Sequence, residues 1–213
     1  MNDWIARLFS HPELATMGHH QRVEDLNLGL GWLYYALGRT LRPQLAVVIG
    51  SYRGFVPCVL GRALADNLER GTVTFIDPSM VDDFWKEPAA VERWFRDAGV
   101  SNVRHYAMTT QEFVQTQAYR DLAPVGILFV DGYHSLEQVR FDYETFRGKL
   151  APEAITLFHD SIRVRTSRMY GDDRPYEHRV KDLMDALKRD AGLQVLDLPY
   201  GDGLTLVRRL RPA

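Results

Sequence analysis

Five short apolar segments alternate with helix-like segments, and this alternation restricts the fold more than any other feature of the sequence. The apolar segments are residues 45–50, 72–78, 103–108, 125–131 and 154–160. Apolar strands that are separated by helices are typical of a parallel sheet covered by helices on both faces. The chain is therefore expected to fold as an α/β protein.

The helices between and after these strands are expected over residues 55–68, 89–100, 111–122, 135–150 and 177–192. Residues 193–198 and 204–210 then flank the turn sequence PYGDG, which is typical of a β-hairpin. A hairpin makes the last strand antiparallel. The expected architecture is a Rossmann-like, doubly wound, mostly parallel seven-stranded sheet with an antiparallel C-terminal hairpin strand.

The segment before the first strand looks helical, because apolar residues recur near helical spacing over residues 21–41. These residues are Val23, Leu26, Leu30, Leu33 and Leu37. We expect N-terminal helices in a cap region, residues 1–42, and one further domain over residues 43–213. The aromatic residues of the cap region could cover a ligand site or provide a face for a homo-oligomer, and packing in the core is the alternative that their spacing favours.

Composition excludes several classes of protein. A formal net charge of −2 argues against a general electrostatic attraction to nucleic acid or to an anionic membrane. No apolar run approaches the length of a membrane span. Cys58 is the only cysteine, so an intrachain disulfide is excluded, and a packed core thiol in a cytoplasmic protein is the simplest interpretation.

Three of the five expected parallel strands end on an aspartate, at Asp77, Asp131 and Asp160. Ligands of open α/β sheets bind at the carboxyl ends of the strands, near the point where the strand order reverses. The three carboxylates are therefore expected at the ligand-binding edge of the sheet.

The first strand runs into the sequence GSYRGF, with Gly50 and Gly54 before a helix. Glycines at this place let the backbone approach a ligand, and the helix N-terminus favours an anionic group. As a glycine motif it is weak, because Tyr52 stands where a dinucleotide motif has its middle glycine, and a plain tight turn is the alternative. Asp77, at the end of the second strand, is placed to accept hydrogen bonds from ribose hydroxyls, or it is a turn residue before Pro78.

The sequences VDGYHS and FHDS end the fourth and fifth strands. If these strands are neighbours, Asp131 and Asp160 share one crevice with a histidine, and close carboxylates repel unless a proton or a cation lies between them. A hard divalent cation such as Mg²⁺ would resolve the repulsion, and His134 could take a proton from a bound hydroxyl. The alternative is a set of hydrogen-bonded polar residues at strand ends.

Together with the terminal hairpin, the stretches VVIGSYRGF, TFIDP and ILFVDGYHSLEQVRFDYETFRGKLAPEAITLFHDS resemble class I S-adenosylmethionine-dependent methyltransferases. More narrowly, they resemble metal-assisted small-molecule O-methyltransferases, the branch of the macrolide sugar enzymes and the cephalosporin hydroxylase-like proteins. The resemblance implies methyl transfer to a hydroxyl of a sugar, a catechol-like compound or another molecule of natural product biosynthesis.

The resemblance also implies a role for each matching residue. The cofactor would be bound by Gly50, Ser51, Tyr52, Gly54, Asp77 and Asp131. His134 would be the general base, with Asp131 beside it. A divalent metal, usually Mg²⁺, would be held by Asp131, His159 and Asp160.

Two departures from the family pattern bear on these roles. Val48 stands where relatives often have an acidic residue that binds the amino acid end of the cofactor. His159 stands where relatives have a carboxylate, which suits Mg²⁺ less well and imidazole-binding metals better. Two other classes are weighed against this enzyme: a degenerate methyltransferase fold that serves as a binding module, and a dinucleotide-dependent oxidoreductase.

Overall fold

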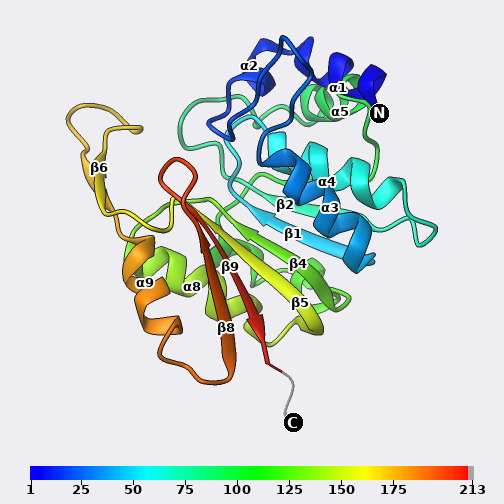
Figure 1. Cartoon of the computed structure of the whole chain (residues 1–213). Helices are drawn as coiled ribbons and strands as arrows, with labels where there is room; N and C mark the ends of the chain where they lie inside the picture. The colour runs from blue at the N-terminus through cyan, green and yellow to red at the C-terminus, as the bar shows by residue number, and fades with distance from the viewer. Residues whose placement is uncertain (211–213) are drawn as a thin grey trace.

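The computed structural model describes residues 1–210, and a seven-stranded sheet forms its centre (Figure 1). The strand order is β3-β2-β1-β4-β5-β9-β8. The parallel strands are β1 (Leu45–Ile49), β2 (Thr72–Ile76), β3 (Val103–Tyr106), β4 (Val125–Val130) and β5 (Leu150–His159). The hairpin of β8 (Leu193–Leu198) and β9 (Leu204–Arg209) adds to β5 with β9 antiparallel. The expected fold class is confirmed.

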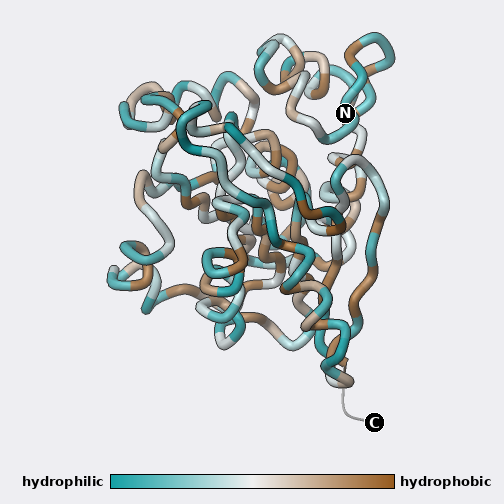
Figure 2. The backbone as a smooth tube through the Cα atoms, turned by 90° about the vertical axis from the view of Figure 1, so that its left-hand side faces the viewer, coloured by the Kyte–Doolittle hydropathy of each residue, from teal (hydrophilic) through white to brown (hydrophobic). Residues whose placement is uncertain are grey.

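Successive residues of the strands face opposite sides of the sheet, and each side has its own apolar cluster. Ala46 and Val48 of β1 pack on one side with α1 (Asn2–Phe9), α2 (Pro12–Ala15), α3 (Gly31–Leu41), α4 (Phe55–Ala65) and α5 (Pro88–Asp97). Val47 and Ile49 pack on the other side with α6 (Thr110–Phe113), α8 (Leu136–Arg147) and α9 (Val180–Leu187). In Figure 2 the hydrophobic stretches run through the interior of the molecule.

β1 lies inside the sheet, between β2 and β4, and the direction of strand addition reverses there. The loops after β1 and β4 are the neighbouring carboxyl ends at this reversal point, so ligand binding is expected between them. The N-terminal helices pack on the same body, because the Trp4 indole N–H donates to the Ala98 carbonyl oxygen at 2.9 Å. Cys58 is fully buried on α4, and burial raises the pKa of its thiol.

Three expected helices differ in the structure. The helix expected over residues 177–192 spans only Val180–Leu187, because Tyr176–His178 pair as a strand. Residues 111–122 form two short helices, α6 and α7 (Gln117–Arg120), because the Thr116 side chain accepts a hydrogen bond from the Tyr119 amide and starts a new helix. The expected helix over residues 21–41 begins only at Gly31. Leu26 and Gly29 have positive φ angles of 54° and 58°, which end a right-handed helix.

The polar connection after β5 contains a small hairpin of β6 (Arg165–Ser167) and β7 (Tyr176–His178), which the sequence analysis did not expect. This hairpin extends from the body of the molecule above the carboxyl ends of the strands (Figure 1). Among the described residues, no helix has the length and apolar character that crossing a bilayer requires.

Candidate active site

A cavity of about 450 Å³ opens at the carboxyl ends of β1, β2, β4 and β5. This volume is in the range of small-molecule binding sites. Most of the residues singled out from the sequence line it: Gly50, Ser51, Tyr52, Asp77, Asp131, His134, His159 and Asp160. Gly54 does not line the cavity; it precedes α4 with a φ of +84°, and a Cβ atom there would lie 3.0 Å from the Trp85 ring.

The turn after β1 approaches the backbone that follows β4. Gly50 has a φ of +68°, and a Cβ atom at this position would lie 2.4 Å from the carbonyl oxygen of Asp131. Only glycine permits this approach. The Trp85 indole N–H donates to the Tyr52 carbonyl oxygen at 2.7 Å, and Arg53 binds Asp82 at 2.6 Å. These contacts fix the turn in place at the wall of the cavity, which Gly50, Ser51 and Tyr52 line.

Asp77 lies at the end of β2 with its carboxylate on the cavity wall. Its Oδ1 accepts a hydrogen bond from the Ser79 amide at 2.8 Å. Burial raises the pKa of Asp77 to about 6, against the opposing effect of the amides of Ser79 and Ser51. A largely buried carboxylate of this kind keeps acceptor capacity that hydroxyl groups of a ligand can use.

The cavity also contains one further buried carboxyl group, which the sequence analysis did not single out. Asp142 lies on α8 and accepts a hydrogen bond from Gln138 at 2.8 Å, but its Oδ2 atom is buried without a partner. Burial raises the pKa of Asp142 to about 6. The signal in the sequence was a single acidic residue inside the otherwise apolar stripe of the helix.

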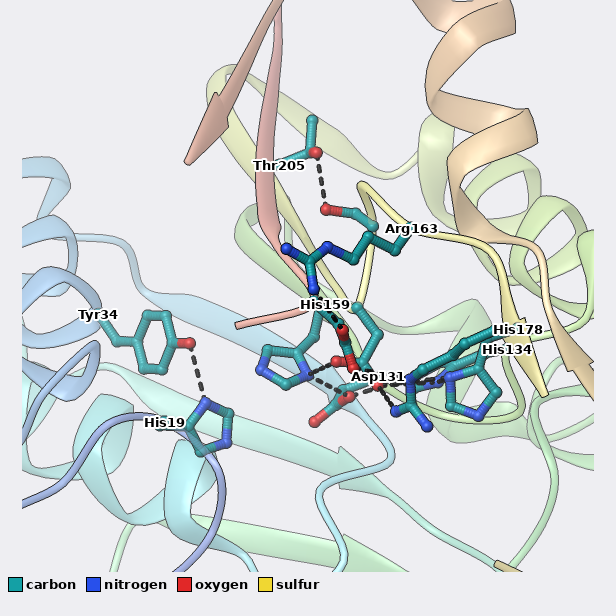
Figure 3. A network of polar contacts seen from close by, with 12 residues as sticks. His19, Tyr34, Asp131, His134, His159, Arg163, His178 and Thr205 are labelled. Carbon is teal, nitrogen blue, oxygen red and sulfur yellow. Dashed lines mark hydrogen bonds and ion pairs between the residues drawn. The ribbon is translucent and has the colours of Figure 1, made fainter. Parts of the chain in front are cut away.

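The ends of β4 and β5 bring the expected cluster together (Figure 3). His159 lies between the two carboxylates, with its Nδ1 atom 3.1 Å from Asp131 Oδ1 and 3.3 Å from Asp160 Oδ1. His134 lies on the other side of Asp131, with Nε2 3.2 Å from Asp131 Oδ1. His134 Nε2 is buried, and it has no hydrogen-bond partner despite this short distance.

The electrostatics of the cluster make His159 a cation at neutral pH. Burial alone would lower the pKa of His159, but the charges of Asp131 and Asp160 outweigh this effect and raise it to about 9. Burial would raise the pKa of Asp131, but His159 and His134 hold it well below its usual range. The imidazolium therefore balances the two carboxylates, which is the role that the sequence analysis gave to a metal ion.

His178, which the sequence analysis missed, completes the cluster from β7. Its Nδ1 atom lies 2.9 Å from His134 Nδ1 and 3.4 Å from Asp160 Oδ2. Arg165 donates to the same Asp160 oxygen at 2.6 Å. His178 is the one histidine in the arginine-rich stretch 161–180, and this was the only signal in the sequence.

The N-terminal segment closes one side of the cavity. Thr16, Met17 and Gly18 line the cavity, and the ring of the buried His19 lies 4.6 Å from the ring of His159. The Tyr34 hydroxyl and His19 Nδ1 share a hydrogen bond at 3.1 Å. Burial and the nearby charge of His159 lower the pKa of His19 to about 3, so it stays neutral beside the imidazolium.

Two sets of side chains at the cavity contain donor atoms that could bind a metal ion. The set expected from the sequence, Asp131, His159 and Asp160, fits a hard cation poorly, because it includes an imidazole and such cations prefer oxygen ligands. Among residues 1–210, the three side chains whose ligand atoms all lie within 4.8 Å of one another are His134, Asp160 and His178. The assignment of Mg²⁺ to Asp131, His159 and Asp160 stays a prediction.

Comparison with known proteins gives one family match and several similar solved structures. The family model described as a methyltransferase domain matches residues 47–161, more than half of the chain. A solved structure of a protein from Corynebacterium glutamicum is similar with a TM-score of 0.68 and 20% sequence identity, over 99% of this chain and 91% of that one. The O-methyltransferase TomG from Streptomyces achromogenes, solved with S-adenosylmethionine, is similar with a TM-score of 0.64 and 17% identity, over 98% of this chain and 88% of that one.

A curated relative is the uncharacterized protein y4gI of Sinorhizobium fredii, which is 30% identical over 146 residues. The match covers 61% of this chain but only 14% of that protein. The chain therefore corresponds to a small part of this relative.

Proposed function

The chain belongs to the methyltransferase domain family, and on this premise we propose that it transfers the methyl group of S-adenosylmethionine to a hydroxyl oxygen of a small molecule. The observation that supports the proposal most strongly is the pair of Asp131 and His134 at the wall of the cavity. His134 Nε2 is buried, lacks a hydrogen bond and lies 3.2 Å from Asp131 Oδ1. A nitrogen in this position can accept a proton from a hydroxyl group.

The residues around the cavity fit S-adenosylmethionine. Gly50, Ser51 and Tyr52 line the cavity on the turn after β1, where the amino acid end of the cofactor would bind. Asp77 offers carboxylate oxygens for ribose hydroxyls. When bound, the cofactor supplies a methyl group that is already activated on a sulfonium ion.

The protein must then deprotonate the acceptor hydroxyl and position its oxygen for attack on the methyl group. His134 would accept the proton of the hydroxyl at Nε2. Asp131, whose Oδ1 lies 3.2 Å from this nitrogen, would stabilise the imidazolium that forms. The neighbouring His159 cation keeps Asp131 ionised, because it holds the pKa of this carboxyl well below its usual range.

The acceptor class is inferred from the cavity and from relatives. TomG is an O-methyltransferase of tomaymycin synthesis, which supports an oxygen acceptor and a natural product as substrate. Sugars and catechol-like compounds remain the other two classes expected from the sequence.

Two experiments test the proposal. Calorimetry with S-adenosylhomocysteine and, separately, with NAD is expected to give binding of the first only. Transfer of a labelled methyl group to a panel of catechols, phenols and sugars is expected to give a methyl ether.

A non-catalytic binding module is the alternative, and the buried Val48 in place of an acidic residue gives it some support. That alternative requires no transfer to any acceptor and no effect of replacing His134.

A further inference from the structure

Three nitrogen and oxygen atoms on three different elements meet at one point beside the cavity. They are Nδ1 of His134 in the loop after β4, Oδ2 of Asp160 after β5, and Nδ1 of His178 on β7. The two nitrogens lie 2.9 Å apart, and the oxygen lies 3.6 Å from the first and 3.4 Å from the second. We propose that these side chains form a binding site for one divalent transition-metal ion such as Zn²⁺ or Co²⁺.

The three distances match the spacing of ligands around a single ion. Zinc lies about 2.0–2.2 Å from histidine nitrogens and carboxylate oxygens. Adjacent ligands of a tetrahedral or octahedral ion at this distance are about 2.9–3.5 Å apart. The observed triangle has nearly these dimensions, so an ion could be bound with small movements of the side chains.

The chemistry of the ligands selects the kind of metal. Two imidazoles and one carboxylate suit zinc, cobalt, nickel and iron, whereas magnesium and calcium prefer oxygen ligands. This site shares only Asp160 with the oxygen-rich set expected from the sequence. It therefore differs from that set in both position and metal preference.

The Tyr176 hydroxyl orients His178 as a metal ligand, and Asp131 lies beside the corresponding nitrogen of His134. A metal-bound histidine commonly donates a hydrogen bond from its other ring N–H to a carboxylate or another polar group, and this bond fixes the orientation of the ring. His178 Nε2 shares a hydrogen bond with the Tyr176 hydroxyl at 2.9 Å. His134 Nε2 lies 3.2 Å from Asp131 Oδ1 without a hydrogen bond, and it would donate to this oxygen once a metal ion at Nδ1 places the proton on Nε2. Both Nδ1 atoms lie within 3.6 Å of Asp160 Oδ2. Both histidine side chains are buried, at 7% and 1% exposed.

One cation competes directly with a metal ion for Asp160. Arg165 donates to Asp160 Oδ2 at 2.6 Å and also binds Asp202 at 2.8 Å. The positive charges that face the site are those of Arg165 and His159, and the negative ones are those of Asp131 and Asp160. An incoming ion would displace Arg165 from Asp160, while Asp202 could keep the guanidinium nearby.

Metal binding would regulate the methyl transfer, and this part of the inference rests on the proposed function. An imidazole that coordinates a metal through Nδ1 carries its proton on Nε2, so it donates there and cannot accept. His134 would therefore be unable to act as the base while the ion is bound. The site itself stands on geometry and is tested without methyl transfer.

The experiment is a titration of the full chain, stripped with EDTA, with Co²⁺. The readouts are the visible absorption of coordinated cobalt and the calorimetric stoichiometry. We expect one equivalent to bind. His178→Gln and Asp160→Asn should each weaken binding by at least about 10-fold, since removing even an outer partner of a metal ligand has effects of this size. His20→Gln, at an exposed histidine outside the cluster, is the matched control and should bind as the wild type does.

Arg165→Gln is the second variant, and it should bind Co²⁺ more tightly because it removes the competing cation. An increase cannot result from misfolding. The inference is overturned if the wild type shows no coordinated cobalt, or if His178→Gln and Asp160→Asn keep full affinity. S-adenosylhomocysteine binding, measured on the same samples, distinguishes this failure from failure of the proposed function.

Discussion

Replacing Asp77 by asparagine should stabilise the fold while it weakens cofactor binding. Burial raises the pKa of this carboxyl from an ordinary value of 3.8 to about 6. Because the folded protein holds the proton more tightly than the unfolded chain, the ionised carboxylate costs stability as the pH rises. The two pKa values give a cost of about 3 kcal/mol at pH 7.5 and about 1.5 kcal/mol at pH 5.

Asparagine is isosteric with aspartate, and its carbonyl oxygen can still accept the hydrogen bond from the Ser79 amide. Urea unfolding of Asp77→Asn should therefore show a gain of up to about 3 kcal/mol at pH 7.5, and about half of that gain at pH 5. Asp172→Asn, at a carboxylate that is 90% exposed, is the control and should change nothing.

Calorimetry should show weaker binding of S-adenosylhomocysteine by Asp77→Asn, because a charged acceptor of ribose hydroxyls becomes neutral. The reasoning is refuted if the variant is no more stable than the wild type at pH 7.5, or if the gain is the same at both pH values.

Three further changes follow from the same site. His159→Leu removes the cation between Asp131 and Asp160 and should destabilise the fold by about 3–5 kcal/mol in thermal or urea unfolding; an unchanged stability would contradict the charge balance. In the wild type, the stability that His159 contributes should be complete below about pH 6.5 and decline as the pH rises toward 9, a trend that should be missing in His159→Leu. Gly50→Ala places a Cβ atom 2.4 Å from the Asp131 carbonyl oxygen and should abolish binding of S-adenosylhomocysteine, whereas Gly148→Ala, with open space around it, should bind normally.

The layout of the sheet could be predicted from the sequence because its signals are local. Apolar segments, the helices between them and the PYGDG turn each specify one element, and the handedness and packing rules of α/β proteins determine how they assemble. The predicted helices differ from the observed ones where a side-chain hydrogen bond or a positive φ angle interrupts the helix. The Thr116 side chain restarts a helix, and positive φ angles at Leu26 and Gly29 interrupt an apolar pattern that has helical spacing.

The position of Asp77, Asp131 and Asp160 at one cavity could be predicted because they follow strands that share one edge of the sheet, whereas their roles stay predictions. His178 and His19 could not be placed in this way, because each comes from an irregular segment whose path depends on tertiary packing. The charge of His159 was also beyond sequence reasoning, since it depends on distances of 3.1 and 3.3 Å to two carboxylates. The position of a histidine after a strand does not specify which charged side chains will surround it in the fold.

The central claim is that His134 accepts the proton of a hydroxyl that is then methylated. The direct test is the single-turnover rate of labelled methyl transfer from S-adenosylmethionine to the best acceptor of the panel, for the wild type, His134→Gln and the control His20→Gln. We expect His134→Gln to bind S-adenosylhomocysteine as the wild type does and to transfer the methyl group about 10²–10⁴-fold more slowly, the usual contribution of a general base. His20→Gln should keep the wild-type rate. A His134→Gln variant that binds the cofactor and transfers the methyl group at the full rate would contradict the account.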